Sequence, residues 1–141
     1  MAIGNVGRIL FVRLAEGDDL LEMIKRSAQE YAFRAAAFIL IGALRNVVLG
    51  CYKDGDYVYT RLDGPLEIAS CMGNVAVDEN GEVVVHSHLV VSNEKAEAFG
   101  GHLMVGSHVG PTAELMLFEA AGVDLRRMFD EKTKLKLLKL S

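Results

Sequence analysis

The chain has no excess of positive charge. Its 141 residues include 15 Lys and Arg against 19 Asp and Glu, so the net charge is −4, and the isoelectric point is near 5.5. Proteins that bind duplex nucleic acid usually present a basic surface, because their affinity comes largely from phosphate contacts. The charge balance therefore argues against DNA as a partner.

Cysteine is scarce as well. Cys51 and Cys71 are the only two, they lie far apart, and they form no Cys-x-x-Cys motif. Two cysteines cannot build a disulfide framework. We expect both to be reduced, buried and small apolar residues in a cytoplasmic protein.

Long apolar runs are absent too. The longest covers residues 35–44, which is about half of the roughly 20 residues that a membrane-spanning helix needs. The first residues have neither the basic cluster nor the long apolar core of a signal peptide. We expect no membrane as a partner.

Apolar residues are nevertheless abundant overall. With Gly counted and Tyr left out, they make up roughly 58% of the chain, against about 45 to 50% in an average domain. A chain of this length has room for one domain with a limited interior. We therefore predict one domain over residues 1–141 that hides part of its apolar surface in an oligomer.

The periodicity predicts one helix and many strands. Asp19 and Glu22 mark a helix start, and apolar residues then recur at helical spacing for about fourteen residues. Asp-Gly and Asn-Gly pairs and the segment 63–65 predict turns between alternating segments. The expected strands cover residues 7–14, 35–44, 45–53, 57–61, 66–77, 82–91, 98–104 and 135–140. Residues 112–121 could form a strand or a helix by propensity, and the preceding Gly110-Pro111 favours a strand. The segment 124–129 is expected to form a short turn of helix, and 135–140 an edge strand guarded by lysines.

The predicted fold class is therefore α+β. It is a single domain with a largely antiparallel sheet of seven to eight strands and one main helix on one face.

All four histidines lie between residues 86 and 108. His86 and His88 share one face of a predicted strand, with Cα atoms roughly 6.6 Å apart. If residues 93–97 form a five-residue loop centred on Lys95, opposite residues have numbers that sum to 190, and His88 then faces His102. This triangle suits a metal of zinc's size, with Zn–N distances of about 2.0 to 2.1 Å.

Two alternatives stand beside this prediction. A bulge at Gly100-Gly101 would shift the register by one residue. The histidines could also be ordinary polar residues of a half-exposed strand. His108 follows Gly106 and precedes Gly110-Pro111, so we expect it beyond the strand, on a loop, and less suited to be a ligand.

Glu67 is the candidate catalytic residue. It lies with Ser70 on the strand expected beside the histidine strand, where a carboxylate could orient a ligand or act on bound water. Equally, Glu67 could form a purely structural ion pair with Arg13 or Arg61.

Several motifs carry a family resemblance. They read V-H-S-H-L at 85–89, G-G-H-L at 100–103, and G-x-x-V-x-x-T-A-E at 106–114. Further matching segments are G-P-L-E-I-A-S at 64–70, G-N-V at 73–75, R-L at 13–14, G-D-D-L at 17–20, L-x-R at 125–127 and D-E-K-T at 130–133. Together they resemble the plants-and-prokaryotes-conserved (PPC) domain in its free-standing prokaryotic form. Lys134 departs from the pattern, since the resemblance implies Gly after the threonine.

The resemblance implies a homotrimer with the three histidines matched here by His86, His88 and His102. Plant members join the domain to an AT-hook and bind DNA, and free-standing prokaryotic members are often named DNA-binding. An AT-hook is an R-G-R-P type motif, in which proline follows arginine. Here both prolines, Pro65 and Pro111, follow Gly, so the sequence contains no such motif.

Three functions remain open. The first is a zinc-binding homotrimer with an open metal position, acting on or sensing a small polar ligand; whether it is an enzyme is left open. The second is a DNA-binding or transcription-associated protein. The third is a non-catalytic trimeric interaction module.

Overall fold

The computed structural model describes residues 1–140 and is mostly β-sheet. Its elements, in order, are β1 (Asn5–Leu14), α1 (Leu20–Glu30), β2 (Ala36–Lys53), β3 (Asp56–Asp78), β4 (Val83–Ser92), β5 (Ala98–Leu103), β6 (His108–Ala121), β7 (Leu125–Asp130) and β8 (Leu135–Leu140). The α+β prediction, with one helix and eight strands, is confirmed. Within the described residues, no helix has the length and apolar character needed to cross a membrane.

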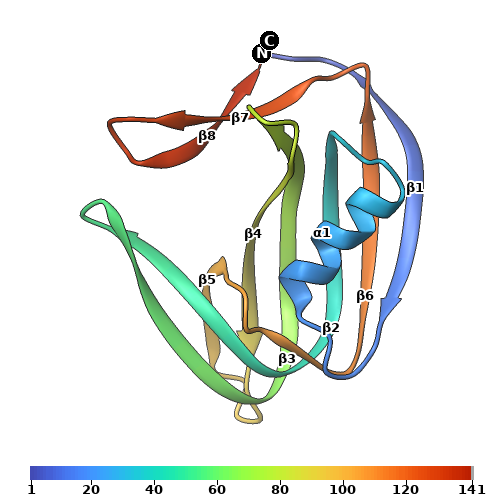
Figure 1. Ribbon diagram of the computed structural model, residues 1–141. Coiled ribbons are helices and arrows are strands. Elements are labelled where there is room, and N and C mark those ends of the chain that lie inside the picture. Colours follow the sequence, from blue (N-terminus) through green and yellow to red (C-terminus); the bar gives the residue numbers. More distant parts are fainter. Residues whose placement is uncertain (141) are drawn as a thin grey trace.

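The helix α1 begins where the sequence predicts. The Asp19 carboxylate accepts a hydrogen bond of 3.1 Å from the Glu22 backbone N–H, which caps an otherwise unpaired donor. Leu20, Ile24 and Ala28 are buried on one side of the helix, which lies across one face of the sheet (Figure 1). The helix has 11 residues rather than about fourteen, because the chain turns at Ala32, where φ is 56°.

The two longest strands are each longer than predicted. Segments 35–44 and 45–53 merge into β2, and segments 57–61 and 66–77 merge into β3. The Gly64-Pro65 pair does not end β3, because the ladder continues on both sides of it, with Leu44 opposite Leu66 and Asn46 opposite Asp63. The extra residues form a bulge, which a ladder tolerates.

The sheet curls back on itself. Its strand order is β1-β6-β2-β5-β4-β3-β7-β8, and β2 also pairs with β3 along almost its whole length. β5 pairs with β4 on one side and with Leu49 and Gly50 of β2 on the other. All pairs are antiparallel except that of β3 with β7.

The short helix predicted at 124–129 is wrong. Residues 125–130 form β7, which pairs with β8 along six residues of each strand. The segment is too short to be stable as an isolated helix, whereas the hairpin satisfies its backbone groups. β8 follows β7 at the end of the strand order, as predicted for an edge strand.

Two hairpins project from the same side of the sheet. One is the outer part of β2 and β3, residues 46–63, which we call the β2–β3 arm; the other is β7–β8 (Figure 1). Their tips are joined, since the Tyr52 hydroxyl donates a hydrogen bond of 2.6 Å to the Thr133 carbonyl. A space bounded by both hairpins and by β4 results.

The core lies between α1 and the sheet. It includes Leu14, Ile24, Phe38, Val75 and Leu117, all nearly inaccessible to solvent. The opposite face of the sheet is not covered by the chain and exposes many apolar side chains.

The cysteine prediction is correct for one residue only. Both thiols are free; Cys71 is buried beside Ser87, whereas Cys51 is exposed on the β2–β3 arm.

Candidate metal centre

The three histidines lie where the hairpin argument places them. His88 is directly opposite His102, and no bulge interrupts the pairing of β4 with β5. Along β4, Ser87, Leu89 and Val91 are buried on the helix side, so His86 and His88 point to the uncovered face. The segment 93–97 closes the loop, with Asn93 N–H donating to the Glu97 carbonyl at 3.1 Å.

The imidazoles form a compact triangle. Their ring centroids are 5.0 to 5.3 Å apart, and one nitrogen of each ring lies within 4.8 Å of the others. His86 Nε2 and His88 Nε2 are 3.2 Å apart. Two nitrogens bound to a tetrahedral zinc would be about 3.3 Å apart, so the spacing fits such a metal.

His102 adds a second observation in favour of a metal. Its Nδ1 atom is buried and has no hydrogen-bond partner within residues 1–140. Buried polar atoms without partners are rare, and each calls for an explanation such as a bound ion or water. The donor set of three imidazoles therefore fits a zinc-type ion.

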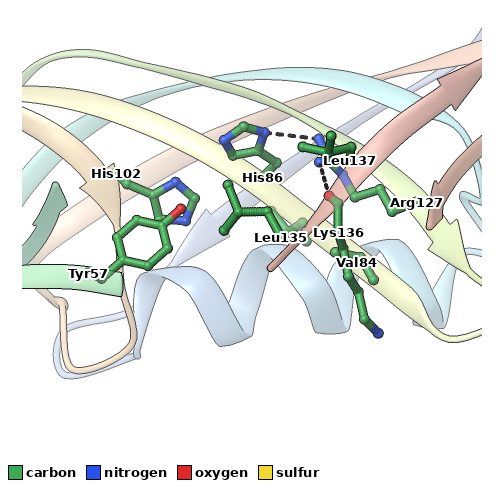
Figure 2. A pocket seen from close by; sticks show the side chains of 9 residues that line it. Tyr57, Val84, His86, His102, Arg127, Leu135, Lys136 and Leu137 are labelled. Carbon is green, nitrogen blue, oxygen red and sulfur yellow. Dashed lines mark hydrogen bonds between the residues drawn. The ribbon is translucent and has the colours of Figure 1, made fainter. Parts of the chain in front are cut away.

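Arg127 of β7 contacts the second ring nitrogen of His86, Nδ1. Its Nη2 donates to His86 Nδ1 at 2.9 Å, and its Nη1 donates to the Lys136 carbonyl at 3.0 Å (Figure 2). Nη2 also donates to Asn74 Oδ1 at 2.9 Å. Because arginine stays protonated, His86 Nδ1 is the acceptor. In the neutral ring the proton is then on Nε2, which faces His88, and binding of a metal at Nε2 would require loss of that proton.

Burial favours the neutral form of the His86 and His102 rings. It acts with the charge of Arg127 and the neighbouring imidazoles to lower the pKa of His86 to about 4. Burial, then the charges of His88 and Arg127, likewise lower the pKa of His102. A neutral imidazole keeps the lone pair that metal binding requires.

A cavity of about 200 Å³ opens beside the triangle. Figure 2 shows it between the β2–β3 arm and the β7–β8 hairpin, with Tyr57 beside His102 and Arg127 beside His86. The remaining lining residues are apolar except Lys136, whose Nζ donates to Asp78: Val84, Val85, Leu135, Lys136 and Leu137.

His108 does not join the triangle. It is the first residue of β6 rather than part of a loop, and its Nδ1 lies 3.1 Å from Asn46 Oδ1. The loop prediction is therefore wrong, because this residue pairs with Asn46 of β2.

Glu67 lies away from the histidines. It pairs with Ser92, four residues along β4 from His88, which is about 13 Å at the usual rise per residue. It lines a different cavity, with Arg45 and Pro65. The alternative ion pair with Arg13 or Arg61 is absent from residues 1–140, where Arg61 instead pairs with Asp63 at 3.2 Å.

Sequence reasoning missed Tyr57 and Arg127, which line the cavity, and Asn74, which accepts a hydrogen bond from Arg127. Arg127 belongs to the L-x-R motif noted above, but nothing local connects it to His86, 41 residues earlier. Asn74 is opposite His86 in the β3–β4 ladder, so only a correct strand register could have revealed it.

Comparison with known proteins gives relatives along the whole chain. A metal-containing protein from Archaeoglobus fulgidus is 33% identical, with 99% of each chain covered and a TM-score of 0.87. A plant- and prokaryote-conserved protein from Pyrococcus horikoshii is 30% identical, with 100% and 97% covered and a TM-score of 0.89.

Two further relatives extend the comparison. A candidate DNA-binding protein from Ralstonia eutropha has a TM-score of 0.82 at 24% identity, over 93% of this chain and 90% of its own, and shows a shared fold. The bifunctional protein GlmU of a Synechococcus strain is 30% identical over 129 residues, which are 89% of this chain and 19% of GlmU. The chain thus spans about a fifth of that relative.

The family model described as the Plants and Prokaryotes Conserved (PCC) domain matches residues 1–121. This match covers β1 to β6 and all three histidines. The chain therefore belongs to the Plants and Prokaryotes Conserved domain family.

Proposed function

We propose that the protein is a zinc-binding homotrimer whose three histidines leave a coordination position open to a small polar ligand that it acts on or senses. The observation that carries the proposal is the imidazole triangle, with His86 Nε2 at 3.2 Å from His88 Nε2 and a cavity beside it. The metal-containing relative from Archaeoglobus supports it.

An open site distinguishes this proposal from a purely structural metal site. Structural zinc is usually held by four protein ligands, whereas three ligands leave room for water or substrate, and bound zinc lowers the pKa of that water to about 7. Within residues 1–140 the metal-type cluster contains only the three histidines. The Tyr57 and Arg127 side chains line the adjoining cavity and would orient what binds there.

The uncovered face of the sheet supports self-association, and the family resemblance implies that the assembly is a homotrimer. Phe11, Met116, Ile39, Met72 and His88 are successive partners across five strands, so they form one row on that face. Phe11 is 70% exposed and Met72 is 57% exposed. A continuous apolar surface of this kind usually marks an interface. Self-association would bury it and place His88 at its edge.

Metal content tests the proposal directly. Protein without an affinity tag is loaded with zinc, dialysed and measured by elemental mass spectrometry. We expect about one zinc per chain in the parent and none in His88→Ala. His108→Ala is the matched control and should keep its zinc, because His108 lies outside the triangle. A folded parent that retains no metal would refute the proposal.

A separate readout distinguishes a working site from a stabilising one. If the metal only stabilises a non-catalytic trimeric module, zinc raises the melting temperature through its binding to the folded state. In that case no ligand competes for the open position. A working site predicts that zinc-bound parent protein also binds a small ligand that His88→Ala does not.

DNA association is the second candidate function, because the Ralstonia relative is described as a candidate DNA-binding protein. The net charge of −4 opposes it. A titration of duplex DNA at increasing salt tests it, since phosphate contacts make affinity fall steeply with salt. Absence of binding at low salt would dismiss this candidate.

A further inference from the structure

Arg127 is a buried positive charge without an acidic partner. The residue is 6% exposed, and its three hydrogen bonds go to neutral acceptors on His86, Asn74 and Lys136. No ion pair within residues 1–140 includes it. Burying a charge without a counter-charge is costly, so this arrangement calls for an anion.

The nearby acids do not supply that counter-charge. Asp78 is beside Arg127 in the β3–β7 ladder, but its carboxylate accepts a hydrogen bond of 2.7 Å from Lys136 Nζ and others from two backbone N–H groups. Asp130 accepts from the backbone and hydroxyl of Thr133. Both carboxylates are thus engaged by donors other than Arg127.

Unfilled hydrogen-bond capacity remains around the cavity. A guanidinium has five N–H donors, and Arg127 uses three of them within the described chain. The two that remain are the Nε hydrogen, on an atom that is itself buried, and one hydrogen of Nη1. Tyr57 lines the same cavity, and its hydroxyl has no hydrogen-bond partner within residues 1–140. Two kinds of donor therefore flank one space (Figure 2).

The lining of the cavity indicates that the anion has an apolar part. Val84, Val85, Leu135 and Leu137 surround the polar groups, so an occupant with an apolar body would displace water from these walls. An inorganic oxyanion would satisfy the charge but would leave this surface without contacts. The volume of about 200 Å³ suits a molecule of a few carbon atoms.

We propose that this cavity binds a small aliphatic carboxylate, with its charge paired to the Arg127 guanidinium and its carbon chain against Leu135 and Leu137. The inference rests on the proposed function and deepens it, because the open metal position lies beside the same cavity. A divalent metal would add positive charge and strengthen the preference for an anion.

Isothermal titration calorimetry with three probes tests this. The probes are butyrate, its neutral isostere butyramide, and inorganic phosphate, each titrated into zinc-free and zinc-loaded protein. We expect butyrate to bind about tenfold or more tightly than butyramide in both forms, the scale of a charge-assisted hydrogen bond. Equal binding of butyrate and butyramide, or binding of phosphate in preference to butyrate, would overturn the proposal.

Arg127→Met removes the charge and keeps most of the side-chain volume. It should abolish the preference for butyrate, whereas Arg126→Met, the neighbouring exposed arginine paired with Asp124, should preserve it. Preference for butyrate that is retained in a folded Arg127→Met variant would overturn the proposal.

Leu137→Trp covers the case in which Arg127→Met does not fold. Leu137 is 43% exposed, and the larger ring should fill the cavity and abolish butyrate binding. Butyrate binding that survives this change would contradict the assignment to this cavity.

Metal content measured on the same samples separates the two proposals. Arg127→Met should bind zinc at least as well as the parent, because Arg127 is not a ligand and its charge disfavours a nearby cation. A parent that binds zinc but does not distinguish butyrate from butyramide refutes the carboxylate site alone. A parent that prefers butyrate but retains no zinc refutes the metal centre alone.

Discussion

Arg8 and Glu119 join the edge strand β1 to β6. The Glu119 carboxylate accepts hydrogen bonds from Arg8 Nη2 at 2.7 Å, from Arg8 Nε at 2.8 Å and from the Arg8 backbone N–H at 3.0 Å. These hydrogen bonds lower the pKa of Glu119 from an ordinary 4.5 to about 2. The side-chain bonds from Arg8 make the largest contribution. The pair therefore links the stability of this edge to pH.

The sign follows from proton counting. Between about pH 4.5 and pH 2 the unfolded chain holds a proton on Glu119 that the folded chain does not, so acid destabilises the fold in this range. We expect the difference in melting temperature between the parent and Glu119→Gln to be full above pH 4.5 and to shrink toward pH 2. Thermal unfolding followed by circular dichroism over this range measures it.

The Arg8→Met variant tests whether Arg8 causes the lowered pKa of Glu119. Arg8→Met removes the donors and should return the pKa of Glu119 toward its ordinary range, so its own difference from the parent should shrink over the same pH interval. A difference between parent and Glu119→Gln that stays constant down to pH 2 would contradict the assigned pKa.

At the scale of elements, the turn between β7 and β8 contains a strained residue. Lys134 has a φ of 57°, a left-handed conformation that favours Gly. The family resemblance implies Gly at this position. The Lys134 side chain forms an exposed ion pair with Glu131, and its Nζ lies 5.9 Å from the centroid of the exposed Phe129 ring. Exposed contacts of both kinds contribute little.

Lys134→Gly should therefore raise the free energy of unfolding by about 1 kcal/mol, because relief of left-handed strain outweighs the added freedom of Gly in the unfolded chain. Chemical denaturation measures the change. Lys132→Gly is the matched control in the same turn; Lys132 is not in a left-handed conformation, so this change should not stabilise the protein. A loss of stability in Lys134→Gly would show that the ion pair matters more than the strain.

Long elements explain several differences between prediction and structure. Local signals at 63–65 correctly indicated a departure from regular pairing, but β2 and β3 continue across it because each strand supplies the other with partners. The segment 124–129 was ambiguous alone, and its pairing with β8 decided the outcome. Close packing also requires a glycine opposite Ser87, because a methyl group on Gly73 would overlap the His86 carbonyl oxygen and the buried Phe38 ring.

At the scale of the whole molecule, one sheet face is covered by α1 and the other is apolar and open. This distribution explains the high apolar content of the sequence. The homotrimer predicts a molar mass three times the chain mass of 15.4 kDa. Light scattering coupled to gel filtration measures it.

A charge on the open face should disrupt the proposed trimer. Phe11→Glu places a carboxylate in the apolar row, and we expect it to shift the protein toward monomers, since burial of an unpaired charge is unfavourable. Val105→Glu is the control, because Val105 is 53% exposed in the β5–β6 turn rather than in the row. Trimers that persist in Phe11→Glu would place the interface elsewhere.

The sequence by itself determined the fold class, the helix start at Asp19, and the opposition of His88 and His102, because each depends on short-range periodicity, capping or turn length. Only the tertiary structure decided that Arg127 reaches His86, that Asn74 accepts from the same guanidinium, and that Glu67 lies near another cavity. These contacts depend on which strands become neighbours. Local spacing does not encode that choice, since it follows from burial and backbone pairing over the whole sheet.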